Sequence, residues 1–153
     1  MILTTKDVGN LYNTLAMTEA QTIQWLNTRK NSTAKLRLVN VPYSTYDAED
    51  DERIVEIKNR NKYYAEKTIE CSKLFANYQK SQLKNKTFLY VVIDTKGVYV
   101  FNISNIIAEI TIQPPVAIQM PRTTAFKKKS KIVKYVYNLA ENLCCYHAER
   151  LDE

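Results

Sequence analysis

The chain has 153 residues, 45% of them hydrophobic, which suits a single folded domain whose core requires no metal or disulfide support. Lysine and arginine (22) outnumber aspartate and glutamate (16), and the formal net charge of +6 permits an anionic partner. The chain has two glycines, Gly9 and Gly97, which excludes a glycine-rich phosphate loop. We therefore expect one domain over residues 1–153 that recognises any phosphate by other means.

The cysteines and the N-terminus indicate the compartment. Cys71, Cys144 and Cys145 are odd in number, contain no Cys-x-x-Cys pair, and share the chain with a single histidine, His147. This pattern argues against structural zinc and favours reduced thiols in a cytoplasm. The first residues, MILTTKDVGNLYN, lack the basic-then-apolar pattern of a secretion signal, and no apolar run is long enough to span a bilayer.

The spacing of apolar residues predicts a helix over residues 10–30, with Leu11, Leu15, Ile23 and Leu26 on one stripe. Glu19 falls in the gap of that stripe. A carboxylate on an apolar face needs a cation or a hydrogen-bond donor as a partner. The other reading of Glu19 is a solvent-facing residue on a helix whose stripe is phased differently.

Alternating residues then predict strands. The segments are Lys35–Val41, a short extended piece at Tyr43–Ala48, a polar turn at 49–52 and a strand at Arg53–Lys58. The longest helix is expected over residues 61–84.

The second half is expected to continue the same alternation of helix and sheet. Thr87–Asp94 is nearly continuous in apolar residues and predicts a central strand, and Val98–Ile103 completes a hairpin with it. Residues 105–121 fit more than one state, and residues 131–150 predict a final helix. The expected fold class is α/β or α+β, with a central mixed sheet flanked by helices.

One acidic stretch, TYDAEDDERIVEIKNR, carries the chemistry. With a four-residue turn at 49–52, Ala48 faces Arg53 and Asp47 faces Ile54, which places Asp47 on the same face as Glu56 and Lys58. Diagonal neighbours of this kind lie roughly 7–8 Å apart, close enough for two carboxylates to share one ion. A slip of one residue would turn Asp47 away, and Asp50 or Asp51 would then be the upstream acid. The alternative for Glu56 and Lys58 is an exposed charged pair on a solvated sheet face.

Asp47, Glu56 and Lys58, followed by the helix with IECSK and the strand FLYVVID, resemble the PD-(D/E)XK nuclease superfamily over roughly residues 10–104. The family often adds an acidic residue from a preceding helix, a position that Glu19 matches. The resemblance implies a restriction-endonuclease-like fold and Mg²⁺ or Mn²⁺ held by Asp47, Glu56 and the backbone carbonyl of Ile57. It also implies that Lys58 orients the attacking water or stabilises the phosphorus centre.

Basic residues are the candidate contacts to nucleic acid. Arg60 and Lys73 accompany the acidic motif, and Lys127, Lys128 and Lys129 form a basic run that would make binding depend on salt. Lys73 and the basic run have the alternative of ordinary solvation at the surface, and Lys73 has the further alternative of pairing with Glu70. Tyr46, Tyr63 and Tyr64 are candidates for stacking on bases.

The sequence thus favours a small Mg²⁺-dependent nuclease of phage or mobile-element type that acts on DNA ahead of RNA and is structure-selective or weakly sequence-specific. Endonuclease and exonuclease action both stay open, and a homodimer is compatible because cleavage of both strands requires two sites. The competing hypotheses are a non-catalytic nucleic-acid-binding module and a protein-interaction factor on the same fold.

Overall fold

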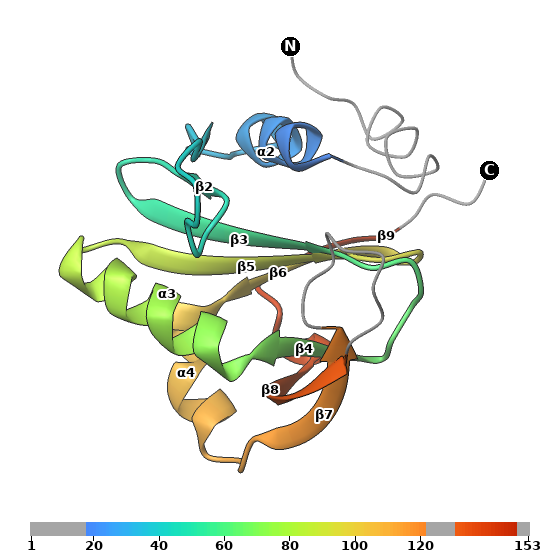
Figure 1. The fold of residues 1–153 in the computed structure, drawn as a ribbon. Coiled ribbons are helices and arrows are strands. Elements are labelled where there is room, and N and C mark those ends of the chain that lie inside the picture. Colours follow the sequence, from blue (N-terminus) through green and yellow to red (C-terminus); the bar gives the residue numbers. More distant parts are fainter. Residues whose placement is uncertain (1–17, 122–130, 150–153) are drawn as a thin grey trace.

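The computed structural model describes residues 18–121 and 131–149. These residues form an α+β structure with a six-stranded mixed sheet, a three-stranded sheet and three α-helices (Figure 1). The expectation of a mixed sheet flanked by helices is therefore confirmed at the level of fold class. None of the helices in the described ranges is long and apolar enough to cross a membrane.

The elements follow one another in an order that alternates between the two sheets. In chain order they are α2 (Glu19–Thr28), β1 (Arg37–Leu38), β2 (Ala48–Glu49), β3 (Arg53–Asn59), β4 (Glu66–Glu70), α3 (Cys71–Leu83), β5 (Thr87–Ile93), β6 (Gly97–Asn102), α4 (Ile103–Thr111), β7 (Val116–Pro121), β8 (Lys131–Ala140), the 3₁₀ turn η1 (Glu141–Leu143) and β9 (Tyr146–Glu149).

The large sheet has the strand order β1-β2-β3-β5-β6-β9, and the small sheet has the order β4-β8-β7. The single parallel pair in the described ranges is β3 with β5, and every other pair is antiparallel. A parallel pair needs a long crossover, which β4 and α3 supply here. This crossover brings the start of α3 back over β3, where the candidate site lies.

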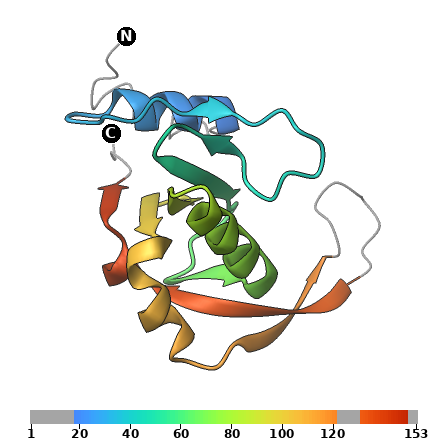
Figure 2. The same cartoon turned by 90° about the vertical axis from the view of Figure 1, so that its left-hand side faces the viewer.

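Both faces of the large sheet are covered. Val55 and Ile57 point to the face on which α2 packs through Ile23, Trp25 and Leu26. Ile54 and its alternating neighbours point to the opposite face, which α3, α4 and the small sheet cover (Figures 1 and 2). The strong apolar content of β5 follows from this double burial.

Two expected helices are wrong in part. Residues 66–70 of the expected helix 61–84 form β4, and the helix begins at Cys71. The described part of the expected helix 131–150, residues 131–149, forms β8, η1 and β9 and contains no α-helix. The sequence KIVKYVYNLA satisfies a helical stripe, but it is also rich in β-branched and aromatic residues. Pairing with β4 on one side and β7 on the other decides for a strand.

The remaining expectations hold with changed bounds. The strand and hairpin at Thr87–Asp94 and Val98–Ile103 are confirmed as β5 and β6. The ambiguous residues 105–121 divide into most of α4 and then β7. The expected strand Lys35–Val41 is reduced to β1. The described part of the expected helix 10–30 is α2, and Trp25 in it is buried as a core residue.

Candidate functional site

The hairpin between β2 and β3 positions Asp47. The observed partners are Ala48 with Val55, so the pairing is shifted by two residues from the expected one. A shift of two preserves the face of every side chain, because the side-chain period of a strand is two. The ladder is not continued at Asp47, because its N–H donates over 2.8 Å to the carbonyl of Val55, the residue that already pairs with Ala48.

Asp50 explains the shift. Its Oδ1 accepts hydrogen bonds from the N–H groups of Glu52 and Arg53, and its Oδ2 accepts from the N–H of Lys35 and from the Arg53 guanidinium. Burial alone would raise the Asp50 pKa, but these hydrogen bonds outweigh it and lower the pKa. Asp50 thus closes a tight turn at Asp51 and Glu52, shorter than the expected four residues, and its carboxylate is engaged in the fold.

The Asp47 carboxylate lies at the edge of β3, and Asp47 is the residue just before β2 begins. Its Oδ2 accepts a hydrogen bond of 2.7 Å from the backbone N–H of Ile57. The resemblance led us to expect a role for the Ile57 carbonyl, and the contact observed at Ile57 is made by its N–H. Asp47 therefore has a fixed carboxylate, half-buried beside Glu56.

Glu19 approaches the same place from the first turn of α2. Thr18 and Gln21 form a capping box there, which fixes where the helix begins. Partial burial, the negative charge of Asp47 and a hydrogen bond with Asp47 together raise the pKa of Glu19. Glu19 is an exposed residue, yet its carboxyl group shares its surroundings with Asp47.

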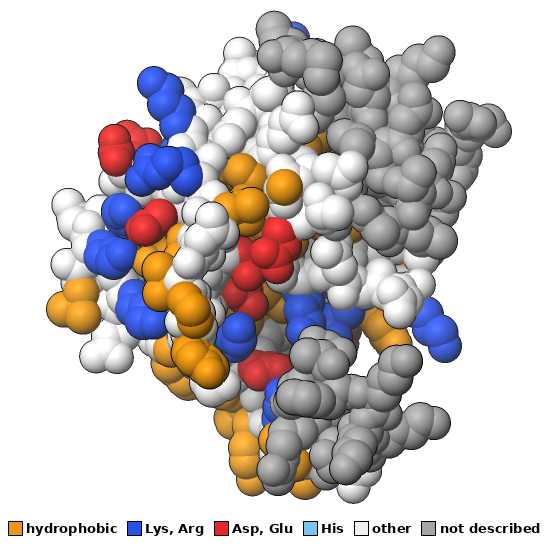
Figure 3. Space-filling model, turned by 45° about the horizontal axis from the view of Figure 1, so that its top comes forward, with side chains coloured by type: hydrophobic (Ala, Val, Ile, Leu, Met, Phe, Trp, Pro, Cys, Tyr) orange, Lys and Arg blue, Asp and Glu red, His pale blue; other side chains and the backbone are white. Residues whose placement is uncertain are grey.

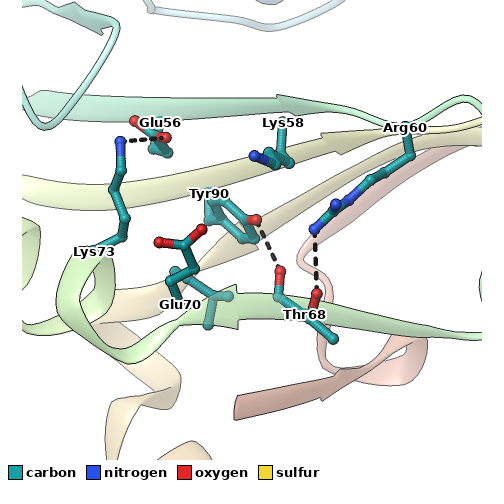
Figure 4. Close-up of a pocket in the computed structure, with 8 residues that line it drawn as sticks. Glu56, Lys58, Arg60, Thr68, Glu70, Lys73 and Tyr90 are labelled. Atoms are coloured by element: carbon teal, nitrogen blue, oxygen red, sulfur yellow. Dashed lines mark hydrogen bonds and ion pairs between the residues drawn. The ribbon is translucent and has the colours of Figure 1, made fainter. Parts of the chain in front are cut away.

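Glu56 is the buried acid of the group, with 7% of its surface exposed. Its Oε1 lies 3.2 Å from the Lys73 ammonium, and its Oε2 is buried without a hydrogen-bond partner (Figure 4). Burial and then the charge of Asp47 raise the Glu56 pKa to about 7, against the opposing influence of Lys73 and Lys58. A buried oxygen without a partner is costly, and a bound cation or donor would relieve that cost.

Lys58 projects from β3 into a small pocket between the two sheets, between Glu56 and Arg60 (Figure 4). Burial and the nearby Arg60 lower the Lys58 pKa, while Glu70 and Glu56 act in the opposite direction. The expected alternation along β3 thus brings Glu56, Lys58 and Arg60 to one pocket.

The lysine and glutamate at the start of α3 find partners other than each other. Lys73 reaches across to Glu56, and Glu70 pairs with Lys134 of β8 over 3.2 Å. The alternative that Glu70 and Lys73 form a pair at the surface is therefore wrong. The reason is the crossover, which places both residues against strands that are remote in sequence.

Arg60 and two residues that the sequence did not single out complete the pocket. The Arg60 guanidinium donates to the Thr68 hydroxyl over 3.2 Å, and the Tyr90 hydroxyl donates to the Thr68 carbonyl over 2.9 Å (Figure 4). Tyr90 is one of several apolar-face positions in FLYVVID, and no local pattern distinguishes it. Only the pairing of β3 with β5, which sets Glu56 beside Tyr90, reveals its place.

The donor set of this region fits a hard divalent cation in chemistry, since Glu19, Asp47 and Glu56 offer carboxylate oxygens. Their mutual repulsion and the unpartnered Glu56 Oε2 are what a cation would relieve. Within residues 18–121 and 131–149, however, no three acidic, histidine or cysteine side chains converge closely enough to form a ready-made metal site. Metal binding here would require side-chain adjustment.

One face of the molecule is mixed in charge. On the face drawn in Figure 3, acidic side chains gather near the centre, with lysine and arginine side chains around them. The expected basic run of Lys127, Lys128 and Lys129 lies outside the described residues. Of the candidate tyrosines, Tyr46 is buried, Tyr63 donates to Glu141, and Tyr64 is exposed.

Comparisons with protein families, with curated proteins and with solved structures found no match to this chain.

Proposed function

We propose that this chain is a metal-dependent nuclease that hydrolyses phosphodiester bonds in nucleic acid, DNA ahead of RNA. The observation that carries the proposal is that Asp47 interacts with Glu19 on one side and with Glu56 on the other, beside Lys58, and that a buried Glu56 oxygen has no partner. The residues come from a helix, a hairpin and a strand that are separate in the chain.

The order of elements around the site also supports the proposal. A helix that begins with Glu19 precedes a hairpin that brings Asp47 near Glu56, and a crossover helix then leads to a parallel, strongly apolar strand. This order agrees with the resemblance to the PD-(D/E)XK nucleases. We therefore also propose that the fold is restriction-endonuclease-like.

In this proposal Asp47 and Glu56 hold Mg²⁺ or Mn²⁺, with Glu19 as an additional acid. The bound ion would supply a more acidic water and neutralise charge on the phosphate. Asp47 is already held by the Ile57 N–H, so it needs little reorganisation.

Lys58 has the task of presenting positive charge to the phosphate. It projects into the pocket from the same strand as Glu56, and it is half-buried, so its charge is screened less by water than that of a surface lysine. Lys73 neutralises part of the Glu56 charge in the absence of an ion. With a cation on Glu56, the Lys73 ammonium becomes available to a phosphate oxygen.

A second candidate function is a nucleic-acid-binding module without catalysis. The absence of a ready-made metal site among the described residues favours it. On this reading Lys58, Arg60 and Lys73 bind phosphates, and the buried acids shape the pocket.

Cleavage assays distinguish the metal-dependent nuclease from the nucleic-acid-binding module without catalysis. Purified wild type, Lys58→Ala and Lys30→Ala are each incubated with plasmid DNA, single-stranded DNA and RNA in Mg²⁺, Mn²⁺ or EDTA. Lys30→Ala is the matched control, because Lys30 is an exposed lysine beyond the C-terminal end of α2. We expect metal-dependent cleavage by wild type and the control and strong loss in Lys58→Ala. Binding without cleavage in any metal would establish the second candidate instead.

A further inference from the structure

A second pocket adjoins the candidate site beyond Arg60. We call it the distal pocket, and its walls include Arg60, Tyr64, Thr68, Val92, Ile118 and Gln119. Arg60 and Thr68 line both the distal pocket and the pocket of the candidate site, so the two pockets are neighbours.

The two pockets differ in size. The pocket at Glu56 and Lys58 has a cavity volume of about 20 Å³, whereas the distal pocket has about 320 Å³. The first suits a water molecule or an ion, and the second falls within the roughly 300–1,000 Å³ typical of pockets for organic ligands. A ligand with a small charged part and a larger flat part matches this pair.

The lining of the distal pocket suits a heterocyclic ring. Tyr64 is 55% exposed, so its ring is open to a stacking partner. Val92 and Ile118 add apolar surface, and the Gln119 amide offers both a donor and an acceptor. An aromatic ring, an apolar wall and an amide together recognise the face and the edge of a nucleobase.

Arg60 connects the two pockets chemically. Its hydrogen bond to Thr68 orients the guanidinium, which carries five N–H donors in total and pairs well with phosphate oxygens. Residues two apart on a strand are separated by roughly 7 Å, so Lys58 and Arg60 present successive positive charges on one face. A nucleotide with its phosphate near Lys58 and Arg60 would place its base toward Tyr64.

Lys67 and Asp94 lie in the floor of the distal pocket and belong to a buried group of ion pairs. The Lys67 ammonium is buried and lies 2.7 Å from Asp94 and 3.1 Å from Glu141. It also lies over the rings of Tyr63 and Tyr99, at 4.4 Å and 4.1 Å from their centroids. A floor held in this way gives the pocket a preformed shape, which reduces the entropy lost on binding.

We propose that the distal pocket binds one unpaired nucleobase, next to the phosphate that the candidate site holds. A base inside a duplex is already stacked on both faces and reaches such a pocket only by leaving the stack. The substrate class is therefore single-stranded nucleic acid or a duplex with an unpaired end. This inference rests on the proposed nuclease function for the position of the phosphate.

Binding without cleavage tests this inference separately from catalysis. The protein is the wild type in EDTA, which removes the metal needed for cleavage, and the probes are a single-stranded oligodeoxynucleotide, the same sequence as a blunt duplex, and that duplex with a single-stranded overhang. Each carries 2-aminopurine, whose fluorescence is quenched by stacking, and affinity is followed by anisotropy. Tyr64→Ala, Tyr64→Phe and Tyr43→Ala are then introduced, Tyr43 being a fully exposed tyrosine (101%) on the loop between β1 and β2.

We expect tighter binding to the single strand and the overhang than to the blunt duplex. Tyr64→Ala should weaken binding to the first two by about tenfold and abolish quenching, whereas Tyr64→Phe and Tyr43→Ala should leave both unchanged. Equal affinity for all three probes, or the same loss in Tyr43→Ala, would overturn the inference. If wild type fails to cleave in any metal yet binds single strands in a way that depends on Tyr64, the nuclease proposal fails. The proposal that the distal pocket binds an unpaired nucleobase is then retained.

Discussion

The Asp47 carboxylate accepts the backbone N–H of Ile57 over 2.7 Å, and by this bond a side chain takes the place of a strand beside β3. β2 begins at Ala48, which pairs with Val55, and within the described residues no strand pairs with β3 on that side beyond Val55. One carboxylate thus completes the hydrogen bonding of the sheet and contributes charge to the candidate site.

The two tasks of Asp47 are separable by mutation. Asp47→Asn retains an oxygen that accepts the Ile57 N–H, whereas Asp47→Ala does not. We expect Asp47→Asn to be more stable than Asp47→Ala by about 1–2 kcal/mol in urea denaturation. Both variants should lose cleavage activity, because both lack the charge. Equal stability of the two would show that the bond to Ile57 contributes nothing.

Glu56 should make stability depend on pH. Its pKa is about 7 in the folded state against 4.5 as the ordinary value, so the folded protein binds more protons than the unfolded chain between these values. The contribution of Glu56 to the free energy of unfolding is therefore fully present below pH 4.5 and is lost as pH rises through 7. The loss is at most about 3 kcal/mol.

Glu56→Gln removes this contribution. We expect the variant to gain stability relative to wild type as pH rises from 5 to 8, measured by urea denaturation, roughly in line with the linkage relation. Glu52→Gln, at a carboxylate that is 73% exposed, serves as the control and should follow wild type. Mg²⁺ should stabilise wild type more at pH 8 than at pH 5, because the ligand must be deprotonated, and should not stabilise Glu56→Gln. A parallel pH profile for wild type and Glu56→Gln would contradict the assignment.

Lys73 should hold Glu56 in its charged form. The ammonium lies 3.2 Å from Glu56 Oε1 and lowers the Glu56 pKa against the influence of burial. We expect Lys73→Gln to raise the Glu56 pKa further, as measured by carboxyl ¹³C NMR titration. The same variant should reduce the salt dependence of nucleic-acid binding by about one counterion if Lys73 contacts a phosphate. An unchanged titration would mean that the ion pair does not persist in solution.

Lys67 and Asp94 form a buried ion pair in the floor of the distal pocket, with side chains 2% and 1% exposed. Lys67→Met leaves the Asp94 carboxylate buried without its cation, and we expect a loss of about 3–5 kcal/mol in the free energy of unfolding. Asp94 also accepts the N–H groups of Lys96 and Gly97, which Asn at this position can still do in part. The double variant Lys67→Met/Asp94→Asn should therefore recover a measurable part of the loss. A double variant no more stable than Lys67→Met would show that the uncompensated charge is not the cause.

Strand periodicity predicted that Asp47, Glu56 and Lys58 share one face, and Glu56 and Lys58 do line one pocket, with Asp47 interacting with Glu56. The assumed turn at 49–52 was longer than the real one, but the error was two residues, and a period of two is insensitive to it. The apolar strand β5 and its hairpin with β6 were equally readable, because nearly every residue there is buried on one face or the other.

Pairing between strands that are distant in sequence decided the secondary structure where the local spacing of apolar residues fitted more than one state. Residues 131–140 suit a helix as well as a strand, and hydrogen bonding to β4 and β7 along both edges stabilises the strand. The contacts of Lys73 with Glu56 and of Glu70 with Lys134 depend on the same arrangement, as does the distal pocket between β4, β5 and β7. Periodicity determines which side of its own element a residue faces, because that is local geometry. Which residue it meets there depends on how the elements pack, and the burial of apolar surface that drives this packing is non-directional and involves the whole chain.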